Sequence, residues 1–175
     1  ARTDDYQQAF RIGSALGVQF HPETDADTAI DWAQSLVGPV LDRAGVTQSE
    51  FATQLRDAED ESAASEAYDA FLWAVGNNHA GTFYPVILGV LPEIEQILRN
   101  GKAWAQRAAM ESLIDLGGSF VPEEGYENYL GAPVQQALNA FIHSMRQHVE
   151  PLANGNDARA KSAIDLLELI DDQAA

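Results

Sequence analysis

The chain has 175 residues, of which 46% are apolar, and this predicts a single globular domain with a sizeable core. Its formal net charge of −17 argues against binding to nucleic acid or to an anionic membrane, and it favours basic partners. The absence of cysteine excludes disulfides, thiolate metal sites and a cysteine nucleophile.

Helical periodicity dominates the first part of the sequence. We expect helices over residues 4–16 and 24–44, separated by a connector in which Pro22 disfavours helical backbone at the preceding residue. A third helix is expected to start at Thr47, because Glu50 three residues later completes the spacing of a capping box.

A fourth helix is expected after the acidic residues 57–61, which suit the first turn of a helix. It is expected to end at Gly76-Asn77-Asn78, since these residue types tolerate left-handed backbone. The apolar positions of this helix recur at helical spacing and predict a buried face made of Ala64, Ala67, Tyr68, Phe71, Leu72 and Val75.

The next stretch predicts a turn followed by two helices of similar length. Gly81 allows the backbone to reverse, Thr82 is a candidate cap for the next helix, and Pro85 suits its first turn. Tyr84 suits the edge of a core, and His79 is a candidate to bond a neighbouring helix end. Whether the turn only sets the angle between helices or also contacts a partner is left open. The first helix is predicted to bury Val86, Ile87, Val90, Leu91, Ile94, Ile97 and Leu98, and the second Ala105, Ala109, Leu113 and Leu116.

A loop rich in Glu, Gly, Pro and Tyr occupies residues 119–131, and loops of this length are often functional. One long helix is expected to follow it, and a last helix comes after Asn154-Gly155-Asn156. The predicted inward residues are Val134, Ala137, Leu138, Phe141, Ile142, Met145 and Val149 in the long helix, and Ala160, Ala163, Ile164, Leu167 and Ile170 in the last.

Two helix pairs recur with a period of about fifty residues, near that of two-helix HEAT repeats. Pro85-Val86 opens the first pair and Pro133-Val134 opens the second. We therefore predict an all-α, HEAT-like α-α superhelix of stacked helical hairpins with about seven helices. It is expected to form one domain over residues 1–175, with divergent acidic N-terminal helices in 1–78 and two HEAT-like helix pairs in 79–175. A helical bundle without repeats is the alternative.

One local pattern is distinctive: a His-x-Gly-Thr-aromatic-Tyr-Pro turn, a helix with an internal proline, and a second helix with an Arg-Ala-Ala start. It consists of His79, Gly81, Thr82, Phe83, Tyr84, Pro85, Pro92 and Arg107-Ala108-Ala109. With this pattern, about a quarter of the chain resembles bacterial HEAT-repeat-containing proteins. The resemblance implies a binding protein, and some members of that family occur beside secreted toxin genes as candidate immunity proteins. The acidic first 60 residues depart from the family pattern.

No motif predicts a catalytic or metal site. His143 and His148 are five residues apart and so lie on different faces of a helix, whereas paired zinc ligands need a spacing of four. Gly117-Gly118 is not followed by the Lys-Ser or Lys-Thr of a phosphate loop, and no Gly-x-Ser-x-Gly elbow occurs. We therefore expect no catalytic residues, no cofactor, no metal and no enzymatic activity.

Acidic residues and tyrosines are the candidate partner-binding residues. Acids of residues 57–69, with a second group at Asp25, Asp27 and Asp31, would complement a basic protein, while a solvated surface without a partner is the alternative. The tyrosines expected to be exposed are those of the 119–131 loop, and tyrosine is frequent at interfaces. The predicted partner-binding residues are Asp57, Glu59, Asp60, Glu61, Glu66, Asp69, Tyr126 and Tyr129.

The functional hypothesis is a non-enzymatic protein-binding module, an acidic immunity or antitoxin-like protein that neutralises a basic toxin, such as a nuclease, by occluding it. Two alternatives stay open: a helical-repeat enzyme or small-ligand receptor that uses clustered carboxylates, and a self-associating scaffold. No apolar run approaches the length of a membrane span and no signal peptide is visible, so we expect a cytoplasmic protein. Ala1 in place of a methionine leaves a removed export signal open.

Overall fold

The computed structural model describes residues 9–12, 15–18 and 52–173. Helices account for most of these residues, and the predicted all-α class is confirmed. None of the helices in this part of the chain is both long and apolar enough to cross a membrane. The helices are α4 (Thr53–Asp57), α5 (Glu61–Val75), α6 (Val86–Asn100), α7 (Ala103–Gly118), α8 (Val134–Ser144), α9 (Arg146–Ala153) and α10 (Ala160–Asp172).

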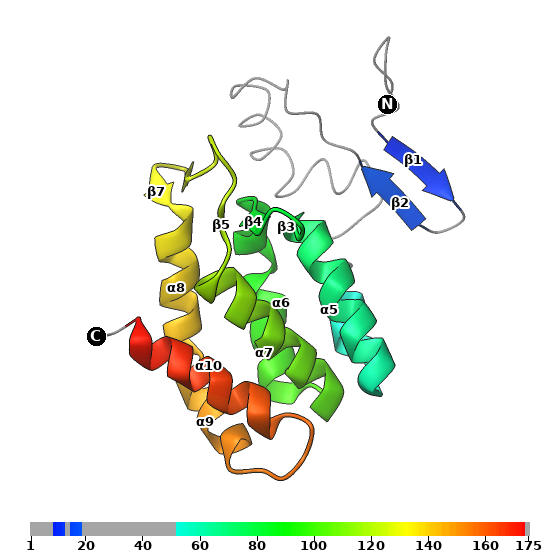
Figure 1. Cartoon of the computed structure of the whole chain (residues 1–175), viewed down its shortest axis with the longest axis vertical. Helices are drawn as coiled ribbons and strands as arrows, with labels where there is room; N and C mark the ends of the chain where they lie inside the picture. Colours follow the sequence, from blue (N-terminus) through cyan, green and yellow to red (C-terminus); the bar gives the residue numbers. More distant parts are fainter. Residues whose placement is uncertain (1–8, 13–14, 19–51, 174–175) are drawn as a thin grey trace.

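The helices from α5 onward form two layers. In the front layer of Figure 1, α7 lies in the middle and contacts α5 on one side and α10 on the other. Behind it, α6 packs against α7, and α9 packs against α10. Helix α6 also contacts α8 and α9, so two neighbouring antiparallel pairs, α6–α7 and α8/α9–α10, lie against each other through both layers.

The core between the layers is apolar and follows the predicted faces of α5 and α6. Phe71, Leu72, Ile87 and Ile94 are almost fully buried, as the helical spacing predicts. Each side chain of this size contributes about 1.5–3 kcal/mol when it is withdrawn from water. The middle helix α7 is buried on more than one face, because helices of both layers pack against it.

Three short strands form a small sheet at one end of the layers. Strand β3 (Gly76–Asn77) pairs antiparallel with β4 (Thr82–Phe83), and β4 pairs in parallel with β5 (Val121–Pro122). The main-chain bonds are continuous across the second pair, since Val121 N donates to Gly81 O at 3.0 Å and Glu123 N donates to Phe83 O at 2.9 Å. The sheet thus joins the residues that precede α6 to the residues that follow α7.

The turn before α6 differs from its prediction in two details. Gly81 has a φ of 66°, so the expected backbone reversal is confirmed. Gly76 ends α5 in extended rather than left-handed backbone, and its lack of a side chain lets β4 approach: a Cβ there would lie 2.1 Å from the Thr82 carbonyl oxygen. Thr82 does not cap α6, because it belongs to β4 and its hydroxyl donates to the Glu123 carboxylate instead.

The prediction of a helix over residues 4–16 is wrong. Strands β1 (Ala9–Ile12) and β2 (Ala15–Val18) pair antiparallel with Ala9 opposite Val18 and Ile12 opposite Ala15. The sequence between them, Gly13-Ser14, is typical of two-residue hairpin turns, and this local signal outweighs the weak helical periodicity. The predicted helix at 24–44 and the capping box at Thr47 lie outside the described residues.

The C-terminal helices also depart from the prediction. The expected long helix is divided at Met145 into α8 and α9. The buried face of α10 is rotated, with Ser162 and Leu166 inside and Ile164 45% exposed. Ser162 is accepted in the interior because its hydroxyl donates to the Glu111 carboxylate at 3.0 Å.

Candidate protein-binding surface

Two segments of the chain form the small sheet and the loops next to it. We call these segments, residues 76–85 and 119–133, the loop end. The second segment contains β5 and a hairpin of β6 (Asn128–Tyr129) and β7 (Ala132–Pro133). The parallel pairing of β4 with β5 fixes the two segments to each other. The sequence anticipated neither this pairing nor the hairpin, because both depend on residues far apart or on two-residue strands.

An aromatic pair connects the two segments of the loop end. The rings of Tyr84 and Tyr126 meet edge to face, with centroids 5.3 Å apart and an angle of 89° between the planes. Burial, followed by the nearby charge of Glu123, raises the pKa of both tyrosine hydroxyls. The Glu123 carboxylate accepts a hydrogen bond from the Thr82 hydroxyl at 2.5 Å, so it also bridges the segments.

The expectation that Tyr126 and Tyr129 form an exposed pair is wrong. Both are partly buried: Tyr126 packs on the Tyr84 ring, and Tyr129 packs against the apolar core. The rings stabilise the loop that carries them, and only parts of their surfaces are accessible. This outcome follows from the large apolar area of a tyrosine ring, which favours a place at the edge of a core.

Apolar side chains that sequence reasoning had not singled out are exposed at or beside the loop end. Leu130 is 76% exposed at the tip of the β6–β7 hairpin, and Val121 is 56% exposed on β5. Trp73, in the last turn of α5, is 48% exposed and meets the His79 ring edge to face at 4.8 Å. His79 therefore contacts the end of α5 through this tryptophan ring, whereas a hydrogen bond to a helix end was expected. A leucine within a polar, glycine-rich loop was the available sequence signal for Leu130.

The loop segment is also acidic. Glu123, Glu124 and Glu127 form no ion pair with another described residue, and Glu127 accepts a hydrogen bond from Gly125 N at 3.1 Å. The backbone N–H groups of Glu127 itself and of Gly125 lower the pKa of the Glu127 carboxyl. The loop end therefore combines exposed apolar groups with carboxylates that no described cation neutralises.

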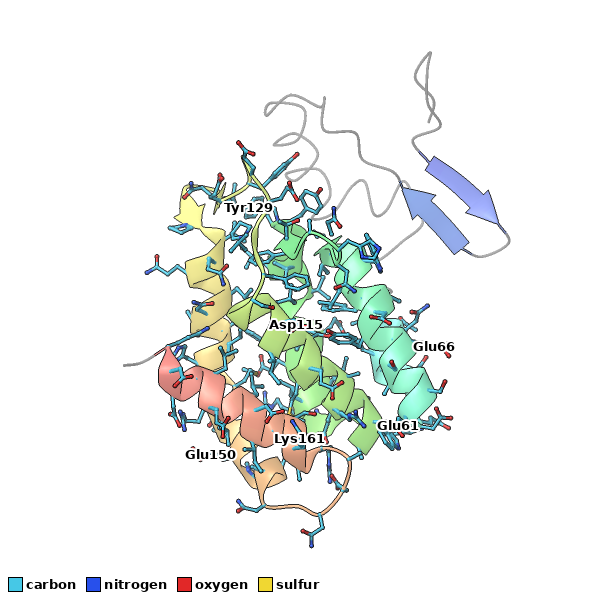
Figure 2. The ribbon with its side chains drawn as sticks, viewed as in Figure 1. Glu61, Glu66, Asp115, Tyr129, Glu150 and Lys161 are labelled. Carbon is cyan, nitrogen blue, oxygen red and sulfur yellow. The ribbon has the colours of Figure 1, made fainter. Side chains whose placement is uncertain are left out.

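The predicted acids of residues 57–69 lie elsewhere on the molecule. Figure 2 shows Glu61 and Glu66 along α5 and Tyr129 at the opposite end of the helical layers from Glu61. Several of these acids already have partners: Glu59 pairs with Lys102, and Glu61 pairs with Arg107 at 3.5 Å. Asp60 is the N-cap of α5 and accepts a hydrogen bond from Ala63 N at 2.9 Å.

The remaining three of these predicted acids, Asp57, Glu66 and Asp69, are exposed and form no ion pair with another described residue. The structure thus brings the predicted tyrosines together with the sheet and places Glu61, at the start of α5, at the opposite end of the helical layers from Tyr129. The second acidic group, Asp25, Asp27 and Asp31, lies outside the described residues.

Carboxylates also line the surface of α7 between α5 and α10, and they are engaged by donors of this chain. Glu111 accepts from Arg107 Nε at 2.8 Å and from the Ser162 hydroxyl at 3.0 Å. Asp115, labelled in Figure 2, accepts from the Tyr68 hydroxyl, and burial together with this bond raises the tyrosine pKa. These contacts tie three helices of the front layer together, which is a structural role.

Comparisons with known proteins add no assignment: no family model matches the sequence, and no similar curated protein or solved structure was found. Within residues 52–173, no group of three or more histidine or acidic side chains is arranged to hold a metal ion. The geometry of the loop end and the charge of the surface therefore carry the functional argument.

Proposed function

We propose that this chain is a non-enzymatic protein-binding module, and that it neutralises a basic protein, such as a secreted toxin, by covering its functional surface. In this proposal the two stacked helix pairs are HEAT-like repeats. The sequence pattern from His79 to Arg107-Ala108-Ala109 supports that reading, as does the side-by-side packing of α6–α7 with α8/α9–α10.

One observation carries the proposal: the lysine and arginine side chains of residues 52–173 are already neutralised. Every lysine and arginine of residues 52–173 forms an ion pair with a carboxylate of the same chain, namely Arg56, Arg99, Lys102, Arg107, Arg146, Arg159 and Lys161. The unpaired acidic side chains therefore make the remaining charge of this part of the surface negative. A partner with a basic surface would therefore be attracted to this part of the protein, without repulsion from unpaired lysine or arginine side chains of residues 52–173.

The two groups of predicted contact residues then have different roles. The exposed acids of α4 and α5, Asp57, Glu66 and Asp69, contribute to the field that accelerates encounter. The loop end supplies the close contact, because it carries the two most exposed large apolar side chains of the described residues, Leu130 and Val121, together with unpaired carboxylates. Long-range charge mainly sets the association rate, whereas buried contacts mainly set the dissociation rate.

The test is co-expression of the chain with the product of the adjacent gene, followed by purification, calorimetric titration and stopped-flow kinetics at low and physiological salt. We expect a one-to-one complex whose association rate falls as the salt concentration rises. No complex at either salt concentration would refute the toxin-neutralising function.

A charge-matched pair of variants tests the surface. Glu66→Gln with Asp69→Asn removes two negative charges from α5, and Glu168→Gln with Asp172→Asn removes two from α10. Similar small losses in association rate in both variants are expected if the charges act through the general field. A large increase in the dissociation rate of the complex, seen only for the α5 variant, would instead show that these acids contact the partner directly.

A further inference from the structure

Leu130 occupies an unusual place for a large apolar residue. It has a φ of 50°, the only positive φ of a non-glycine residue in the described part of the chain. Gly131 follows with a φ of 80°, and the register of Tyr129 opposite Ala132 makes the two residues a two-residue hairpin loop. Positive φ at both loop positions is the pattern of a type I′ turn, whose first position favours asparagine, aspartate or glycine.

Leucine is therefore disfavoured twice at this position. Its Cβ is strained in left-handed backbone, and its side chain is 76% exposed, more than any other large apolar side chain of the described residues. Neither the turn nor the core gains from it. An asparagine would satisfy the turn and leave no apolar surface in water.

The surroundings of Leu130 indicate the chemistry of what would cover it. The same loop carries Glu123, Glu124 and Glu127, none of which pairs with a described cation. Tyr129 beside it is held against the core, so the hairpin has a fixed base. An apolar tip with carboxylates nearby is complementary to an apolar pocket bordered by lysine or arginine side chains.

We propose that Leu130 is a hydrophobic anchor, which inserts into an apolar pocket on the basic surface of the protein partner. This inference rests on the proposed function and assigns the contact to one side chain. The hairpin positions the leucine before binding, since its backbone conformation is set by the turn and by the β6–β7 pairing. Little ordering is then needed when the complex forms.

The experiment compares three variants of the full chain in titrations with the product of the adjacent gene. Leu130→Asn is expected to weaken the Kd by about 10- to 100-fold, mainly through faster dissociation. The same variant is expected to raise the Tm of the free protein by about 2–4 °C, because asparagine suits the turn. Leu130→Met, which keeps an apolar side chain, is expected to bind within a few-fold of the original protein.

Ile164→Gln is the matched control, because Ile164 is another exposed large apolar residue, 45% exposed on α10, and its loss is expected to leave the Kd unchanged. A complex that Leu130→Asn leaves intact would refute the anchor while the proposed function stands. No complex with the original protein would refute both. A lower Tm for Leu130→Asn would show a structural role for the leucine, and a dimer of the original protein that this variant dissociates would show that a second copy covers it. Either result would overturn the proposal.

Discussion

The contact between Gly76 and β4 gives the sharpest prediction for stability. Replacing Gly76 by alanine would place a Cβ 2.1 Å from the Thr82 carbonyl oxygen and 2.8 Å from the Phe83 Cα. Both atoms belong to the backbone, so no side-chain rotation relieves the contact. The strands would have to separate by about 1.3 Å for this Cβ to reach ordinary van der Waals distance from the carbonyl oxygen.

The separation has a calculable consequence, because Phe83 is fully buried and lies opposite Gly76 in the β3–β4 register. Moving its backbone also displaces its ring from the core. Overpacking of this kind costs typically 1–3 kcal/mol, and the loss of strand pairing places the change near the upper end, at about 3 kcal/mol. For a chain of this length, that lowers the Tm by about 6–12 °C.

The assay is urea unfolding followed by circular dichroism, with Gly118→Ala as the control. A Cβ at Gly118, the last residue of α7, would find its nearest neighbour, a Leu169 methyl carbon, at 3.4 Å, which is an ordinary contact. Gly118→Ala is therefore expected to raise the free energy of unfolding by about 0.5–1 kcal/mol. A Gly76→Ala variant within about 0.5 kcal/mol of the original protein would refute the reasoning on strand contact.

Three further predictions concern polar contacts and charge. Gln106 donates a hydrogen bond to Leu98 O and accepts one from Arg159, both at 2.7 Å. Gln106→Leu is therefore expected to lower the free energy of unfolding in urea by about 1–3 kcal/mol. An unchanged midpoint would show that water replaces the side chain of Gln106 in these bonds. The pKa of Tyr68 is raised in the folded state, so stability is fully present below the unfolded pKa of about 10 and falls as the pH rises above it. Tyr68→Phe should make the decline above pH 10 shallower, and an identical pH profile would contradict the bond to Asp115. Stopped-flow association with the adjacent gene product should slow at least several-fold between low and physiological salt, whereas a salt-independent rate would exclude steering by charge.

The sequence was sufficient for elements whose signal is local. The spacing of apolar residues in α5 and α6 correctly predicted both the helices and their buried faces, because one side of each helix packs on the core. The face of α10 was predicted wrongly, since Ser162 is held inside by Glu111 of α7, a contact about fifty positions away in the chain. Hydropathy alone predicts that a serine is exposed, whereas the hydrogen bond from Ser162 to Glu111 allows this serine to be buried.

The candidate surface was predictable only in part. The loop at 119–131 was predicted from its length and composition to be a candidate binding loop, and its tyrosines were expected to be the exposed contact residues. Tyr126 instead packs on the Tyr84 ring and Tyr129 packs against the core, while Leu130 is exposed by a turn whose backbone conformation the sequence does not reveal. The distance between Glu61 and Tyr129 likewise depends on the packing order of the helices.

The parallel pairing of β4 with β5 has a consequence for how the molecule opens. The residues before α6 and after α7 are hydrogen-bonded to each other, so the β4–β5 pairing joins the two ends of the chain segment that contains this helix pair. We therefore expect complete local unfolding of α6 and α7 to require that the β4–β5 pairing opens, whereas this pairing can stay closed while the flanking helices fluctuate. The amide hydrogens of Val121 and Glu123, which form the bonds of this pairing, should therefore exchange with solvent at least as fast as the slowest amides of α6 and α7.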